Sequence, residues 1–115
     1  MHELSIALSI VEMAEAEAVR SGSGQVHAVH LRLGRLSGVE KSALLASYEM
    51  ACHATPLEGS RLLIEEIPIE VFCSRCGVAR GVDSRQWFAC TECGAPTPTI
   101  LHGKEMEVVA LEIQG

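Results

Sequence analysis

Apolar residues recur every three or four positions through the first twenty residues of the chain. The periodic positions are Leu4, Ala7, Leu8, Val11, Ala14 and Ala18, and Ile6, Ile10 and Met13 widen the apolar face. This spacing predicts a largely covered helix from Leu4 to about Arg20. The run Ser-Gly-Ser-Gly at residues 21–24 predicts the turn that ends this helix.

After this turn the pattern changes to alternation of apolar and polar residues. Residues 25–33 alternate over their whole length and predict the first strand. Ser37 and Glu40 stand three residues apart, and this spacing predicts a capping box that opens a second helix. We expect the second helix to end near His53, before a Thr-Pro pair.

Two further extended segments follow. Residues 61–72 alternate, and Pro68 within them predicts an edge strand or a bulge, because proline cannot donate to a ladder. Residues 105–113 predict the last strand. The element order therefore predicts an α+β fold, with two helices packed on a three-stranded sheet and an insert between the second and third strands.

The insert contains four cysteines in two pairs, and each pair is followed at once by glycine. The cysteines are Cys73, Cys76, Cys90 and Cys93. A Cys-x-x-Cys-Gly turn directs both sulfurs into one site, and two such turns predict a four-cysteine zinc ribbon of the rubredoxin-like kind. Iron is the alternative metal for this ligand set, and two redox pairs or disulfides are the alternative to a metal site.

Length and composition are consistent with one domain plus a small module. The chain has 115 residues, of which 48% are hydrophobic and only 3% aromatic, so we expect an aliphatic core. We place the sheet domain at residues 1–70 plus 104–115 and the ribbon module at residues 71–103. Cys52 stands apart from the pairs and is predicted to be a small buried apolar residue.

The charge and the apolar runs bear on possible partners. The formal net charge is −6 and no basic run is present, so the electrostatic term that dominates nucleic-acid binding has the wrong sign. No basic residue precedes the first apolar residues, and no apolar run reaches spanning length, so we expect no signal peptide and no membrane. Paired thiols without an export signal favour the cytoplasm.

The first residues form a second candidate metal site. The α-amino nitrogen of Met1 and the amide and imidazole nitrogens of His2 can bind one ion in fused chelate rings. Nitrogen-rich, near-planar coordination suits Ni(II) or Cu(II). Glu3, in the first helical turn, can orient these ligands or bind the ion itself. From composition alone, an ordinary polar N-terminus is the competing interpretation.

The combination of motifs resembles the HypA/HybF family of nickel metallochaperones for [NiFe]-hydrogenase maturation. The resemblance covers the whole chain and rests on the Met-His-Glu-Leu-Ser start, the Gly-Arg-Leu-Ser-Gly segment at residues 34–38 and the two cysteine pairs. It implies an α/β nickel-binding domain and a zinc domain. It also implies that His2, with the Met1 amine, binds nickel and that Glu3 takes part.

The resemblance implies further roles and partners. Glu40 matches a position that is an acidic nickel ligand in some members, often as Asp, and Glu is one methylene longer. The implied partners are a HypB-type GTPase and the hydrogenase large subunit. Whether urease is also served stays open, and so does the choice between a monomer and a weak homodimer.

The alternative function is an acidic zinc-ribbon interaction or nucleic-acid-binding module without nickel transfer. We expect no enzymatic activity, because no Ser/His/Asp order, phosphate loop or paired apolar carboxylates stand out and an all-cysteine shell has no open position. A redox protein that uses its cysteine pairs is a third interpretation. His102 follows the second pair, and whether it joins the zinc shell is left open.

Overall fold

The structure is a computed structural model that describes residues 3–22, 24–83 and 88–114. The chain folds into two compact units, which are described separately below. The first unit comprises Met1–Arg32, Val39–Glu65 and Glu107–Gly115, and the second comprises Leu33–Gly38 and Glu66–Met106.

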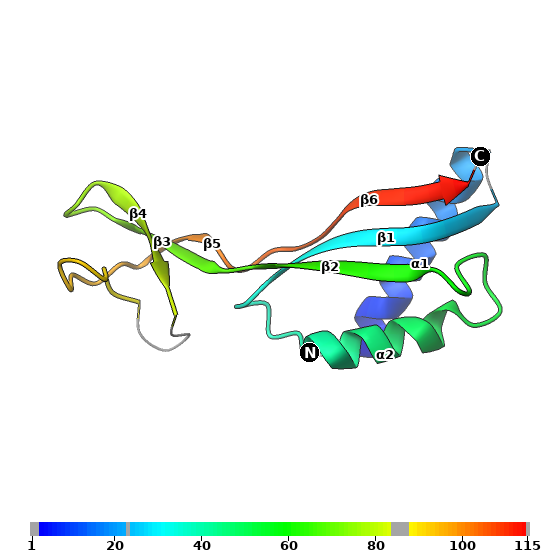
Figure 1. Cartoon of the computed structure of the whole chain (residues 1–115), viewed down its shortest axis with the longest axis horizontal. Coiled ribbons are helices and arrows are strands. Elements are labelled where there is room, and N and C mark those ends of the chain that lie inside the picture. Colours follow the sequence, from blue (N-terminus) through cyan, green and yellow to red (C-terminus); the bar gives the residue numbers. More distant parts are fainter. Residues whose placement is uncertain (1–2, 23, 84–87, 115) are drawn as a thin grey trace. The chain divides into compact units, whose positions relative to one another are not determined.

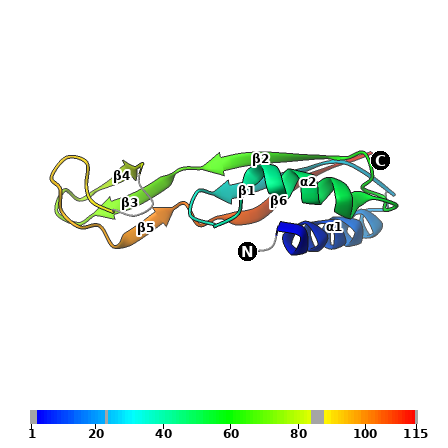
Figure 2. The same ribbon diagram turned by 90° about the horizontal axis from the view of Figure 1, so that it is seen from below.

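The first unit contains both helices and a three-stranded sheet in the order β2-β1-β6 (Figure 1). Helix α1 packs against helix α2, and the two helices lie on the sheet as predicted (Figure 2). The elements are α1 (Glu3–Arg20), β1 (Gln25–Gly34), α2 (Lys41–Cys52), β2 (Arg61–Ile67) and β6 (Met106–Gln114). Strand β1 is central, which explains why most of its apolar residues are buried.

Helix α1 buries a narrower face than the sequence predicts. Its buried residues are Ala7, Ile10, Val11, Ala14 and Ala18. Leu4 and Leu8 were expected on the covered face, but they are 43% and 51% exposed, and Met13 is 41% exposed. The prediction of a largely covered helix is therefore wrong, because only one stripe of this helix contacts its neighbours. Three of the residues in that stripe are alanines, which let α1 approach its neighbours closely.

Helix α2 begins with a different cap from the one predicted. The N-cap residue is Glu40, whose carboxylate accepts hydrogen bonds from the backbone N–H groups of Ser42 (3.2 Å) and Ala43 (2.7 Å). The predicted capping box, with Ser37 as the cap, is wrong. The helix starts three residues later than that box requires, and Glu40 itself satisfies the first free N–H groups.

The second unit contains an antiparallel sheet in the order β4-β3-β5. Its strands are β3 (Ile69–Cys73), β4 (Val78–Val82) and β5 (Thr99–His102). The predicted extended segment 61–72 is thus two strands, β2 and β3, which belong to different sheets and are separated by Pro68. This break confirms the irregularity predicted at Pro68. Its physical cause is that proline lacks the N–H that a continuous ladder would use.

A small apolar cluster supports the second sheet. Ile69, Val71 and Val82 are buried together, and Leu36, Phe88 and Ile100 pack against them. Phe88 thus covers the apolar side of the module as predicted, whereas Trp87, predicted to do the same, lies outside the described residues. Three buried aliphatic side chains make a small core, which is typical of modules that need a further crosslink.

Two glycines pass each other at close range in the second unit. The N–H of Gly34 donates to the carbonyl of Glu105 (2.7 Å), and the N–H of Leu36 donates to the carbonyl of Gly103 (2.6 Å). A Cβ atom added at Gly34 would lie 2.1 Å from the carbonyl oxygen of Gly103. The neighbouring atoms are backbone atoms, so they cannot move aside as a flexible side chain would.

We therefore predict that Gly34→Ala lowers the free energy of unfolding by roughly 1–3 kcal/mol, the usual cost of overpacking. Thermal unfolding followed by circular dichroism measures this change. Gly81→Ala is the matched control, because a Cβ atom at Gly81 would meet nothing within 4 Å. Equal melting temperatures for the two variants would contradict the close approach at Gly34.

Candidate metal centres

The cysteine pairs sit in two turns of the same construction. The N–H of Gly77 donates to the carbonyl of Cys73 (2.7 Å), and the N–H of Gly94 donates to the carbonyl of Cys90 (2.9 Å). Both glycines have positive φ angles, 72° and 74°. An L side chain rarely adopts this conformation, so the glycine after each pair is what allows both sulfurs of the pair to face one side.

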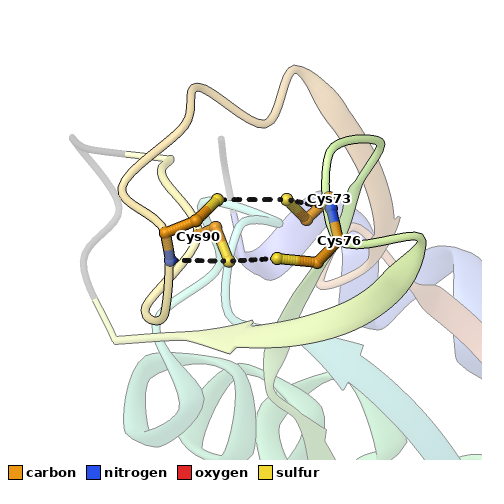
Figure 3. A group of neighbouring side chains, drawn as sticks. Cys73, Cys76 and Cys90 are labelled. Carbon is orange, nitrogen blue, oxygen red and sulfur yellow. Dashed lines mark hydrogen bonds between the residues drawn. The ribbon is translucent and has the colours of Figure 1, made fainter.

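The structure brings the four predicted cysteines together. Their sulfur atoms all lie within 4.8 Å of one another. The sulfur of Cys73 lies 3.7 Å from that of Cys93, and the sulfur of Cys76 lies 3.8 Å from that of Cys90 (Figure 3). Each of these two distances is between a sulfur of one turn and a sulfur of the other turn.

These separations fit a metal site better than a disulfide. Zinc–sulfur bonds of about 2.3 Å in a tetrahedron place the sulfurs about 3.8 Å apart, whereas a disulfide needs about 2.05 Å. All five cysteines of the chain are free thiols. The disulfide alternative therefore finds no support in this geometry, while a four-coordinate soft metal ion fits it.

Backbone N–H groups favour the thiolate form at this cluster. The N–H of Cys76 faces the sulfur of Cys73 (3.4 Å), and the N–H of Cys93 faces the sulfur of Cys90 (3.5 Å). The bond from Cys93 is the largest of the influences that together lower the pKa of the Cys90 thiol to about 6. A thiol that ionises below neutral pH is ready to bind a metal cation.

Arg80 of β4 adds a positive charge beside the sulfurs. Its guanidinium lowers the pKa of the Cys76 thiol and that of the Cys90 thiol. The neighbouring sulfurs of the cluster outweigh Arg80 and raise the pKa of the Cys76 thiol to about 11. Without a metal the cluster therefore retains protons, and a dication that binds there displaces them.

Sequence reasoning did not single out Arg80 as a neighbour of the cluster. Arg80 reaches the cluster because β4 pairs with β3 in antiparallel register, with Val78 opposite Cys73 and Arg80 opposite Val71. That register is set by the tertiary pairing of the strands and is not visible in the cysteine motif.

The candidate nickel residues lie in the first unit. Met1 and His2 fall outside the described residues. Glu3 opens α1, and its Oε2 atom accepts a hydrogen bond from the backbone N–H of Glu40 at the start of α2 (3.1 Å). This bond is the first cause of the lowered pKa of Glu3. Two candidate residues that stand 37 positions apart in the sequence are thus in direct contact.

The carboxylate of Glu40 is already engaged by its own helix. Hydrogen bonds from the hydroxyl of Ser42 and the N–H groups of Ala43 and Ser42 lower the pKa of Glu40. No observation tests its predicted role as a nickel ligand, which stays a prediction.

His102 pairs with a carboxylate in the second unit. Its Nδ1 atom lies 2.7 Å from Glu105, which also accepts the N–H of Gly103 (2.7 Å). Burial raises the pKa of Glu105, but these bonds together lower it to about 2. Over the part of the chain that the structure describes, the group of potential metal ligands comprises the four cysteines without His102.

Cys52 is buried at the end of α2, as predicted for a small apolar residue. Burial raises the pKa of its thiol. Its sulfur lies 3.8 Å from the hydroxyl of Ser60, which also contacts the hydroxyl of Tyr48 (2.6 Å). Cys52 therefore belongs to the packing between α2 and the segment that precedes β2.

Neither described helix combines the length and the apolar character needed to cross a membrane.

Comparison with known proteins gives matches over nearly the whole chain. The family described as "Hydrogenase/urease nickel incorporation, metallochaperone, hypA" matches residues 1–113. The hydrogenase maturation factor HypA of Roseiflexus sp. (strain RS-1) is 47% identical over 114 residues, which cover 99% of this chain and 93% of the relative. The HypA of Chloroflexus aggregans is 46% identical over 97% of this chain and 98% of its own.

Two solved structures share the fold. The solution structure of the Ni metallochaperone HypA from Helicobacter pylori aligns with a TM-score of 0.66 at 23% identity, over 98% of this chain and 97% of that one. A second structure, titled "Solution structure of HypA protein", aligns with a TM-score of 0.73 at 23% identity, over 99% and 97% of the two chains. The extent of the family match and the identity to its named members show that this chain belongs to the HypA family of nickel-incorporation metallochaperones for hydrogenase maturation.

Proposed function

We propose that the chain binds Ni(II) at its N-terminus and delivers it for the maturation of [NiFe]-hydrogenase. The observation that carries the proposal is the match of residues 1–113 to a family described by nickel incorporation. The chain's first residues, Met1, His2 and Glu3, add a ligand set whose chemistry suits that ion.

The proposed nickel ligands are the α-amino nitrogen of Met1 and the backbone and imidazole nitrogens of His2. These three nitrogens form fused chelate rings, and a deprotonated amide favours planar coordination. Glu3 is the fourth candidate, either as a ligand or as an anchor for the ligands. The contact between Glu3 and the Glu40 N–H supports this role, because it ties the start of α1 to the start of α2.

We assign a structural zinc ion to Cys73, Cys76, Cys90 and Cys93, with iron as the alternative metal. A closed four-thiolate shell supplies folding free energy to a module with a small core. It leaves no open coordination position at which a receiving protein could bind the ion. The cross-turn sulfur distances of 3.7 and 3.8 Å support this assignment.

In this proposal the two metal sites have different roles. The nickel domain, at residues 1–70 plus 104–115, carries the cargo, and the ribbon, at residues 71–103, is a stable module. Ligands supplied by the first residues of the chain can be replaced one at a time by the thiolates of a receiving protein, which makes release feasible. The chain itself catalyses no reaction in this scheme.

The partners that fit this scheme are a HypB-type GTPase and the hydrogenase large subunit. The family description names urease beside hydrogenase, which makes urease a candidate second recipient. We place the transfer in the cytoplasm, where thiols stay reduced and can hold zinc.

The nickel assignment predicts that His2→Ala lowers nickel affinity at least tenfold, because the variant loses the imidazole that closes a chelate ring. Isothermal calorimetry with nickel on untagged protein measures the affinity, and zinc content and circular dichroism should stay unchanged. His53→Ala removes an exposed imidazole elsewhere and should bind nickel as the wild type does. Unchanged binding to His2→Ala would overturn the assignment.

The zinc assignment predicts that Cys76→Ser lowers the zinc content of the purified protein from about one ion per chain to well under half, because the variant loses one of four thiolates. Metal analysis by mass spectrometry gives the content. Nickel affinity should change less than threefold. Cys52→Ala is the control and should keep its zinc, so zinc lost equally from both variants would count against the assignment.

A further inference from the structure

Arg80 lies on the inner face of the sheet in the second unit. In the antiparallel register, Arg80 stands opposite Val71, and Val78 stands opposite Cys73. Residues that stand opposite each other in an antiparallel pair share a face of the sheet, and so do residues two apart in one strand. Because Val71 and Cys73 are buried, β4 places a permanent cation on the face that carries both the apolar core and the first cysteine.

A cation on a buried face needs a partner, because a charge that leaves water loses its hydration. The Nε atom of Arg80 is buried and has no hydrogen-bond partner in the part of the chain that the structure describes. None of the ion pairs between described residues includes Arg80. The groups that raise the pKa of its guanidinium are Cys90 and Cys76. The partner that the module offers to this cation is therefore the four-cysteine cluster.

A metal ion in this cluster leaves negative charge for Arg80 to balance. Four thiolates around one zinc ion carry a net charge of about −2. A guanidinium beside the sulfurs offsets part of this surplus, and thiolate sulfur can accept its N–H groups. Groups that act on a metal through its ligands hold those ligands in place, and their removal commonly lowers metal affinity about 10- to 100-fold.

We propose that Arg80 is a positioning residue for the zinc site, and that its positive charge holds the thiolates on the ion and slows the loss of the ion. This role rests on the zinc assignment proposed above and concerns retention of the resident ion, not delivery of nickel. Arg80 acts on the ion through the sulfurs of Cys76 and Cys90. Cys76 is the exposed member of the cluster, so its sulfur is the one that a competing molecule reaches first.

A role of the charge and a role of packing make different demands on the side chain at this position. Arg80→Lys keeps the positive charge, whereas Arg80→Met keeps an apolar stem and removes the charge. A residue that acts through its charge can be replaced by lysine and not by methionine. A residue that only packs its stem against the core can be replaced by methionine.

The experiment loads the full-length protein with one equivalent of zinc and measures the rate at which zinc passes to an excess of a chromogenic chelator. Arg80→Met should lose zinc at least tenfold faster than wild type, and Arg80→Lys should stay within about threefold of wild type. Arg80→Gln, a second neutral side chain, should match Arg80→Met, so that the result does not depend on how methionine packs.

Arg75→Met is the matched control. Arg75 is an exposed arginine in the first cysteine turn, and its replacement changes the net charge of the module by the same amount. This variant should release zinc at the wild-type rate, because an exposed charge is screened by water and salt.

Three results would overturn the proposal in a wild-type protein that holds zinc. They are an unchanged rate in both neutral Arg80 variants, equally fast release from Arg80→Lys and Arg80→Met, and equally fast release from Arg75→Met and Arg80→Met. A wild-type protein that takes up no zinc would instead overturn the zinc assignment, and this role of Arg80 with it. Failure of nickel binding at the N-terminus would leave the zinc-release rates unchanged and would count against the nickel proposal alone.

Discussion

Four sulfur atoms that lie within 4.8 Å of one another repel as thiolates unless positive charge lies among them. The backbone N–H groups of Cys76 and Cys93 and the guanidinium of Arg80 supply part of this charge. A dication bound there would supply the remainder and would join the two turns, which three short strands and a few aliphatic side chains would otherwise have to hold together. The second unit would then depend on that ion for cohesion, which suits a resident ion and not a cargo.

The nickel site proposed for the first unit has a different requirement, because a cargo site must release its ion. Of its candidate residues, Glu3 accepts a hydrogen bond from the Glu40 N–H. One hydrogen bond at an exposed position contributes little to stability, so breaking it would not unfold the unit.

Local patterns predicted some elements well and others poorly. The bounds of α1 and β1 and the position of the irregularity at Pro68 followed from periodicity and from proline chemistry. The exposure of Leu4 and Leu8 did not, because periodicity shows which residues are apolar and not which stripe contacts the sheet. The prediction of Ser37 as the cap of α2 was also wrong, since both Ser37 and Glu40 can cap a helix and the path of the backbone decides which of them does so.

The sequence by itself determined which four cysteines form the candidate metal site, because two sulfurs three residues apart and a following glycine with positive φ are properties of the local chain. It also supplied the Met-His-Glu start that led to the nickel proposal. Only the tertiary structure decided that the two cysteine turns face each other, that Arg80 lies beside them, and that Glu3 contacts Glu40. Those contacts join residues far apart in the chain, and their formation depends on strand pairing and helix packing, which no short motif specifies.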